Sequence, residues 1–105
     1  MELLQGTLDL LVLRALAKEA RHGYDVAGWI RDTTDGTILV EDRALYVALH
    51  RLEDRGLVES EWGVSENNRR ARYYRLTRSG RRELAARMVD WKSYAAAVAK
   101  VLRST

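Results

Sequence analysis

The sequence predicts an α+β fold that is mostly α-helical, and three observations support it. Apolar residues recur at helical spacing within residues 40–56, alternate with polar residues after Gly56, and return to helical spacing in the C-terminal quarter. A chain of 105 residues has the length of one domain and buries roughly 65% of its unfolded surface, which leaves a modest core. Within it we expect a folded unit over residues 1–76 and one long helix over residues 77–105.

The composition excludes several classes of protein. The chain contains no Cys, so disulfides, thiolate metal ligands and a cysteine nucleophile are excluded. Its apolar start up to Ala17 is interrupted by Asp9 and Arg14 and lacks a basic signal segment, so we expect neither a signal peptide nor a membrane span. We therefore expect a cytoplasmic protein.

Charge is distributed unevenly along the chain. Residues 1–66 carry seven Lys and Arg against thirteen Asp and Glu, whereas residues 67–105 carry eleven against two. Seven arginines fall within residues 69–82 with no acid among them, and they repel one another unless a polyanion or dispersed geometry relieves the repulsion. Arginine offers the forked donors that suit phosphates and guanine edges. We therefore expect nucleic acid as the partner, with an acidic protein or a membrane surface as alternatives.

Thr7 is expected to cap a first helix that runs to about Lys18. Apolar side chains occur almost all the way round this helix, at Leu8, Leu10, Leu11, Val12, Leu13, Ala15, Leu16 and Ala17. Such a helix must be covered on more than one side. We expect another subunit to cover part of it, including Leu8 and Leu11; complete coverage by helices of the same chain is the alternative.

His22-Gly23-Tyr24 opens a second predicted helix, and Asp35-Gly36 ends it in a turn. Its buried face is expected to consist of Val26, Ala27, Trp29 and Ile30. Residues 37–40 form a short β-prone piece that leads into a third helix, which Glu41 or Asp42 is able to cap.

The third predicted helix has two faces of different chemistry. Its buried stripe has the spacing i, i+3, i+4, i+7 and consists of Leu45, Ala48, Leu49 and Leu52. The outward face holds Arg43, Tyr46, Val47, His50, Arg51 and Asp54. Arg, Tyr and His supply donors and planar groups that suit base edges and phosphates. A polar face that is merely solvated is the alternative. Gly56 ends the helix.

Residues 57–63 and 70–76 alternate as strands do, and residues 65–69 between them have turn chemistry, which predicts a β-hairpin. Two helices, a polar-faced third helix and a hairpin form the order of a winged helix-turn-helix with a two-stranded wing. Hairpin donors beside the third helix are expected at Asn67, Asn68, Arg69, Arg70 and Arg72. Parity along the strand makes Tyr74 the better core candidate and Tyr73 the better surface one.

Thr77 is a good N-cap for a last helix that runs to about Arg103. A continuous a/d seam with spacing 4, 3, 4, 3, 4 consists of Leu84, Met88, Trp91, Ala95, Val98 and Leu102. At roughly 1.5 Å per residue the helix reaches about 40 Å, more than the core of a small domain needs. We therefore expect dimerisation through this seam and the first helix; an intramolecular core helix is the alternative.

Three stretches of the chain resemble the PadR family of bacterial transcriptional regulators, and the resemblance covers essentially the whole chain. They read MELLQGTLDLLVLRALAKEARHGYDVAGWI, ALYVALHRLEDRGLVESEWG and RRARYYRLTRSGRREL. The second and third, in this order and spacing, are specific. The resemblance implies a winged helix-turn-helix domain with one C-terminal dimerisation helix, the short subtype, acting as a homodimeric repressor that an effector releases from its operator.

By position, the resemblance implies that Arg43–Arg55 is the DNA-reading helix, with the motif tyrosine at Tyr46, and that Asn67–Arg72 is the basic wing. The chain departs from the family pattern, which usually has small residues and Pro, at Asp42, Arg43, Ala44 and Val47. Some relatives use an aromatic residue at the position of Trp91 to stack flat hydrophobic ligands, which implies a small aromatic effector here. A large core side chain is the alternative.

A dimer would place its two DNA-reading helices roughly 34 Å apart, so the expected operator is an inverted repeat in double-stranded DNA. Catalysis is the rival class, but His22 and His50 lie on different predicted elements, and no carboxylate pair or Gly-rich phosphate loop accompanies them. We expect no enzyme, metal or cofactor. His22 is expected to be a helix-start contact and His50 a groove-facing donor. A winged helix that binds protein without specific DNA binding is the alternative function.

Overall fold

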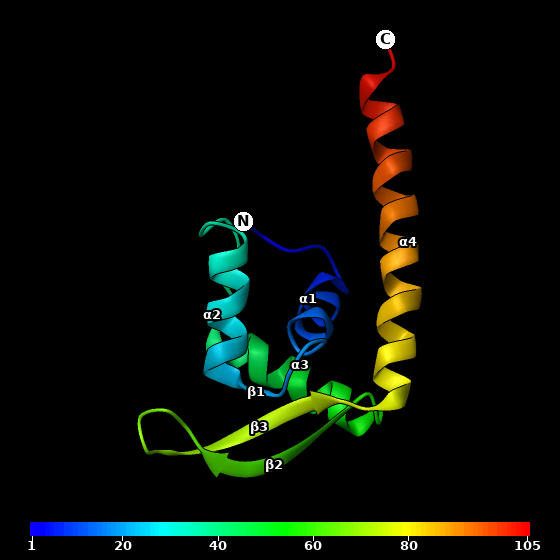
Figure 1. Ribbon diagram of the computed structural model, residues 1–105. Coiled ribbons are helices and arrows are strands. Elements are labelled where there is room, and N and C mark those ends of the chain that lie inside the picture. The colour runs from blue at the N-terminus through cyan, green and yellow to red at the C-terminus, as the bar shows by residue number, and fades with distance from the viewer.

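The computed structural model describes residues 1–105 and has the architecture that the sequence predicts. Its elements in chain order are α1 (Thr7–Ala15), β1 (Arg21–His22), α2 (Gly23–Thr33), α3 (Asp42–Asp54), β2 (Val58–Val64), β3 (Arg70–Leu76) and α4 (Arg78–Arg103). The first three helices gather above the sheet, and α4 rises from the end of the sheet past all of them (Figure 1). The mostly helical α+β fold, with a wing and a long C-terminal helix, is thus confirmed.

The core lies between the first three helices and the inner face of the sheet. All four residues of the predicted α3 stripe are completely buried, and Val12, Leu13, Val26 and Ile30 of α1 and α2 pack in the same cluster. The sheet contributes Val58, Tyr74 and Leu76. Tyr74 is therefore the core tyrosine and Tyr73 is only partly buried, as the strand parity predicts.

Helix α1 differs from the prediction at both ends. Thr7 is its first residue and not its cap, because the Thr7 N–H bonds to the Leu4 carbonyl oxygen and places Gly6 at the cap position, with a φ of 83°. No side chain caps this end. The helix ends at Ala15, three residues before Lys18, because the chain must turn here to reach the sheet. The Ala17 N–H donates to the Arg14 carbonyl oxygen, three residues earlier, where an α-helix would use the carbonyl four residues earlier.

The sheet has three strands where two were predicted. Arg21 and His22 form the short strand β1, which pairs antiparallel with Tyr74 and Tyr73 of β3 in the order β1-β3-β2. Two residues are too short to show an alternating pattern, so only the tertiary pairing reveals this strand. The hairpin strands lie within a residue of their predicted bounds.

Residues 37–40, which the sequence marks as β-prone, form no strand. They follow α2 at the end away from the sheet, where no strand edge is available for pairing (Figure 1). The Ile38 N–H instead donates to Thr34 Oγ1 (3.0 Å), and Ile38 and Val40 pack against the core.

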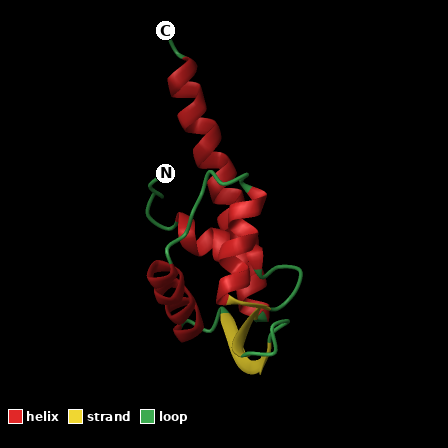
Figure 2. Cartoon of the chain, turned by 90° about the vertical axis from the view of Figure 1, so that its left-hand side faces the viewer, coloured by secondary structure: helices red, strands yellow, loops and turns green.

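Helix α4 begins as predicted, with Thr77 Oγ1 accepting from the Gly80 N–H (3.0 Å). A Cβ at Gly80 would lie 1.9 Å from the Leu57 carbonyl oxygen, so only glycine allows α4 to approach the chain before β2 this closely. Leu84 is buried and Met88 is partly buried, whereas the later turns stand clear of the other helices, as the view turned by 90° shows (Figure 2). None of the helices combines the length and apolar character needed to span a bilayer.

Candidate nucleic-acid interface

A groove of about 1300 Å³ lies between α2, α3 and the hairpin. It brings together six of the nine residues that the sequence predicts to contact DNA, namely Tyr46, His50, Asn67, Arg69, Arg70 and Arg72. Two further arginines line it from outside the predicted set, Arg21 and Arg31. Donors from α3 and from the hairpin are about 20 residues apart in the chain, and they share one concave surface.

The outermost line of α3 consists of Arg43, Val47, His50 and Asp54, all exposed, at the spacing i, i+4, i+7, i+11. Arg43 and Asn68 do not line the groove, but both are exposed. Asn68 occupies the tip of the hairpin with a φ of 59°, a conformation that Asn tolerates better than most residues.

Tyr46 lies at the edge of α3 that faces α2. A Cβ at Gly23 would lie 2.7 Å from Tyr46 Oη, so the tyrosine ring rests against the first turn of α2 and needs glycine there. The neighbouring His22 caps α2, because its Nδ1 accepts from the Asp25 N–H (3.1 Å), which agrees with its expected role as a helix-start contact. Tyr46 nevertheless remains 43% exposed, with its ring available to the groove.

Arg51 points to the opposite edge of α3 and is not in the groove. Its Nε donates to Asp9 Oδ2 (3.2 Å), and a second nitrogen pairs with Asp9 Oδ1. Arg87 of α4 reaches the same carboxylate at 3.7 Å and also pairs with Glu83 (2.6 Å). The hydrogen bond that Arg51 donates to Asp9 raises the pKa of Arg51 above its ordinary value, so the guanidinium stays charged.

Asp9 is only 6% exposed and is a residue that the sequence reasoning missed. An acid within an apolar helix is a signal that could have identified it, because a carboxylate is buried only when cations or donors accompany it. Asp9, Arg51 and Arg87 thus form a cluster that joins α1, α3 and α4.

On the groove side, two linked hydrogen bonds between side chains connect α3 to the hairpin. Ser60 Oγ donates to Glu53 Oε2 (2.5 Å), and Arg72 Nε donates to Ser60 Oγ (2.8 Å). Burial raises the pKa of the nearby Tyr74 phenol, and the charge of Glu53 raises it further. Arg72 is therefore partly committed to holding the hairpin against α3.

The seven arginines that crowd in the sequence are dispersed in space. Arg69, Arg70 and Arg72 line the groove, whereas Arg75 turns to the other face of the sheet and pairs with Glu59 (2.8 Å) and Glu61 (3.1 Å). The remaining three lie in the first turns of α4, where Arg81 donates to the Ala17 carbonyl oxygen (2.9 Å). Only part of the basic run thus faces the groove.

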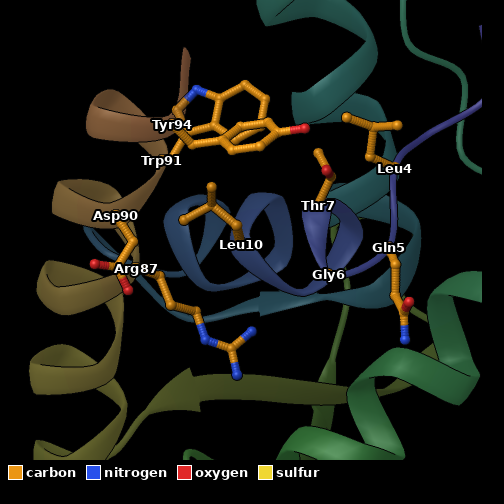
Figure 3. A pocket seen from close by; sticks show the side chains of 9 residues that line it. All are labelled: Leu4, Gln5, Gly6, Thr7, Leu10, Arg87, Asp90, Trp91 and Tyr94. Atoms are coloured by element: carbon orange, nitrogen blue, oxygen red, sulfur yellow. The ribbon is translucent and has the colours of Figure 1, made fainter. Parts of the chain in front are cut away.

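A second cavity of about 560 Å³ lies between the N-terminal segment, α1 and α4 (Figure 3). The Trp91 and Tyr94 rings stand beside each other above Leu10, with centroids 6.0 Å apart. Arg87 and Asp90 of α4 supply charged groups at its border. Beyond this cavity the predicted seam is exposed, with Val98 at 39% and Leu102 at 78%.

The two remaining residues predicted for the dimer interface, Leu8 and Leu11, are partly buried against the core of their own chain. No group of three His, Cys, Asp or Glu residues is placed to hold a metal ion.

Comparisons with known proteins point to one family. A family model described as the transcriptional regulator PadR-like family matches residues 12–86. A transcriptional regulator from Clostridium thermocellum is 29% identical, with a TM-score of 0.83 over 91% of this chain and 90% of that one. A PadR family transcriptional regulator from Eggerthella lenta is 33% identical, with a TM-score of 0.81 over 96% and 86%. A PadR family regulator from Clostridium difficile is 26% identical, with a TM-score of 0.81 over 92% and 99%.

Replacing Asp9 by Asn should lower the free energy of unfolding by about 1 to 3 kcal/mol, because two arginines lose the carboxylate that holds them. The loss should fall short of that for a fully buried pair, since the Arg51 side chain is 42% exposed. Thermal and urea denaturation followed by circular dichroism would measure it. Asp32→Asn is the matched control, because Asp32 forms an exposed pair with Arg31 (3.0 Å) and its loss should leave the midpoint unchanged. Equal losses in the two variants would contradict a structural role for Asp9.

Proposed function

The chain belongs to the PadR-like family of transcriptional regulators, which are DNA-binding proteins and not enzymes, and we propose that it acts as a homodimeric repressor on an inverted-repeat operator. The single observation that carries the proposal is the shared groove, in which donors of α3 and of the hairpin face the same space. Residues 1–76 form the DNA-binding unit in this proposal, and residues 77–105 form the dimerisation helix.

In this proposal α3 reads base edges and the hairpin anchors the protein. Arg43 and His50 project from the outer side of α3 and enter the major groove, while Tyr46 borders it. Arg69 and Arg70 hold phosphates or the adjoining minor groove. Arg51 contributes through its bonds to Asp9 and has no direct contact with DNA in this proposal, since two of its nitrogens bind Asp9 and the side chain does not line the groove.

Arg43→Ala should weaken binding to the preferred duplex by about 1 to 3 kcal/mol and relax preference at one base position. Arg70→Ala should instead weaken all duplexes alike and lower the slope of log K against log salt by about one. Fluorescence anisotropy, with duplexes selected from a random pool and with scrambled duplexes, would measure both effects. Arg103→Ala, an exposed change near the end of α4, is the control. Equal effects of Arg43→Ala and Arg70→Ala on specificity would contradict the division of roles.

Dimerisation is proposed through the exposed part of the α4 seam together with the partly buried side of α1. Trp91, Val98 and Leu102 lie along one line of the helix, and Ala95 between them allows a neighbouring helix to approach closely. Apolar side chains in such a line, beyond the reach of the chain's own core, are the expected surface for a second copy.

Val98→Asp should convert the dimer to a monomer and abolish tight operator binding, because the charge would be buried in the seam. Val89→Asp is the matched control: Val89 is 67% exposed and lies on the opposite side of α4 at 3.6 residues per turn. Analytical ultracentrifugation would report the mass of each variant. A dimeric Val98→Asp variant, or a monomeric Val89→Asp variant, would argue against this interface.

Release by an effector is the remaining part of the proposal, and the Trp91 cavity is the site that we assign to it. The cavity offers two aromatic rings and an apolar floor at Leu10, which suits a small planar aromatic compound. Arg87 lines this cavity and also contacts Asp9, so a compound bound there is next to the cluster that holds α3.

Planar aromatic compounds should quench tryptophan fluorescence on binding and reduce the affinity for the selected duplex. The chain has three Trp residues, so Trp91→Ala is needed as the control that removes the quenching. Titrations of both proteins, with and without duplex, would make the measurement. Quenching that persists in Trp91→Ala, or the absence of any quenching and of any loss of DNA affinity, would exclude this effector site.

A further inference from the structure

Trp62 of β2 is a large aromatic side chain that the core does not use. It is 55% exposed, although Val58 on the same face of the strand is buried. Burial also decreases along the facing strand, from Tyr74 at 2% through the partly buried Arg72 to the exposed Arg70. Trp62 therefore lies on the part of the hairpin that extends beyond the core, on the face that lines the groove.

Two arginines of β3 stack on the Trp62 ring. The Arg70 Cζ atom is 4.3 Å from the ring centroid and the Arg72 Cζ atom is 5.4 Å away. The register explains both contacts, because Arg72 lies directly opposite Trp62 and Arg70 is its diagonal neighbour, opposite Val64. An aromatic face attracts a guanidinium through its quadrupole, most strongly when the ring is that of Trp.

The two arginines differ in what else holds them. Arg72 is also bonded to Ser60, and through it to Glu53 of α3. None of the ion pairs of the chain involves Arg70, so the Trp62 ring is its main restraint. A guanidinium donates in its own plane, and stacking occupies only its faces. Arg70 is therefore oriented while its donors stay available.

We infer that Trp62 is a positioning residue for DNA binding, which holds the Arg70 guanidinium in place before a duplex arrives. The inference rests on the proposed DNA-binding surface and assigns a function to a side chain outside the predicted set. A free arginine loses rotamer freedom when it binds a phosphate, and this loss weakens binding. A stacked arginine has already lost that freedom in the unbound protein. Its contact with phosphate is then more favourable without any new contact to DNA.

Trp62→Leu and Trp62→Phe form the decisive pair, because leucine keeps an apolar side chain whereas phenylalanine also keeps an aromatic face. Binding to a mixed-sequence duplex should be followed by fluorescence anisotropy over a series of salt concentrations, so that no operator is required. Trp62→Leu should lower the association constant about fivefold at every salt concentration. Its slope against log salt should be unchanged, because the number of phosphate contacts is the same. Trp62→Phe should stay within about twofold of the unsubstituted protein.

The double variant separates positioning from direct contact. In an Arg70→Ala background, Trp62→Leu should have little further effect, since the side chain that it positions is gone. A full further loss in that background would mean that Trp62 acts through Arg72 or through its own contact with DNA and not by positioning Arg70, and would overturn the inference. Equal losses in the Leu and Phe variants, or a loss that follows a lowered thermal midpoint, would overturn it as well.

If Arg70→Ala leaves the salt slope unchanged, the hairpin surface of the proposed function fails and the inference fails with it. A normal Arg70→Ala effect with an unaffected Trp62→Leu variant removes the inference alone.

Discussion

The rotation of α3 about its own axis is the constraint on which the remaining structure depends. Thirteen residues must supply one wall of the core and, on the reverse side, a surface of polar and planar groups. Complete burial of Leu45, Ala48, Leu49 and Leu52 leaves only one rotation, because turning the helix would expose leucine and bury arginine. The direction in which Arg43 and His50 project is therefore a consequence of apolar burial.

Polar bonds at the two edges of α3 reinforce this rotation. On one edge Asp9 holds Arg51 and also contacts Arg87 of α4, and on the other edge Glu53 is linked through Ser60 to Arg72 of the hairpin. The Asp9 contacts join α3 to the proposed dimerisation helix. The hydrogen bonds through Ser60 join α3 to the proposed wing. A change at α4 thus has a physical route to α3, through a carboxylate shared by two arginines. The mutual repulsion of these arginines makes their arrangement sensitive to that carboxylate.

Helix α4 is packed against its own chain only over its first turns. Its first turns are held by close backbone approach at Gly80 and by burial of Leu84, whereas its later turns expose apolar side chains that nothing in the same chain covers. Apolar surface of this extent in a small protein is costly in water and is the basis of the proposed dimer. In that proposal the stability of the helix and the geometry of DNA binding are linked, because the same side chains serve both.

Much of this protein could be predicted from its sequence, because the relevant signals are local. Apolar spacing located the helices and the buried stripe of α3, strand parity assigned Tyr74 to the core, and Thr77 marked the start of α4. The family resemblance was also carried by local motifs, and residues 12–86 match the family model. These features depend on neighbours within a few residues, which the order of amino acids specifies directly.

Other features were decided only by the tertiary structure, because they join residues that are far apart in the chain. Strand β1 exists through its pairing with β3, and Arg51 lies outside the groove because Asp9, 42 residues earlier, binds it. The arginine run looks like a single basic patch in sequence, yet strand parity and the start of α4 place its members on different surfaces, and only Arg69, Arg70 and Arg72 line the groove. Periodicity indicates which side chains share a face, but only packing decides what that face meets.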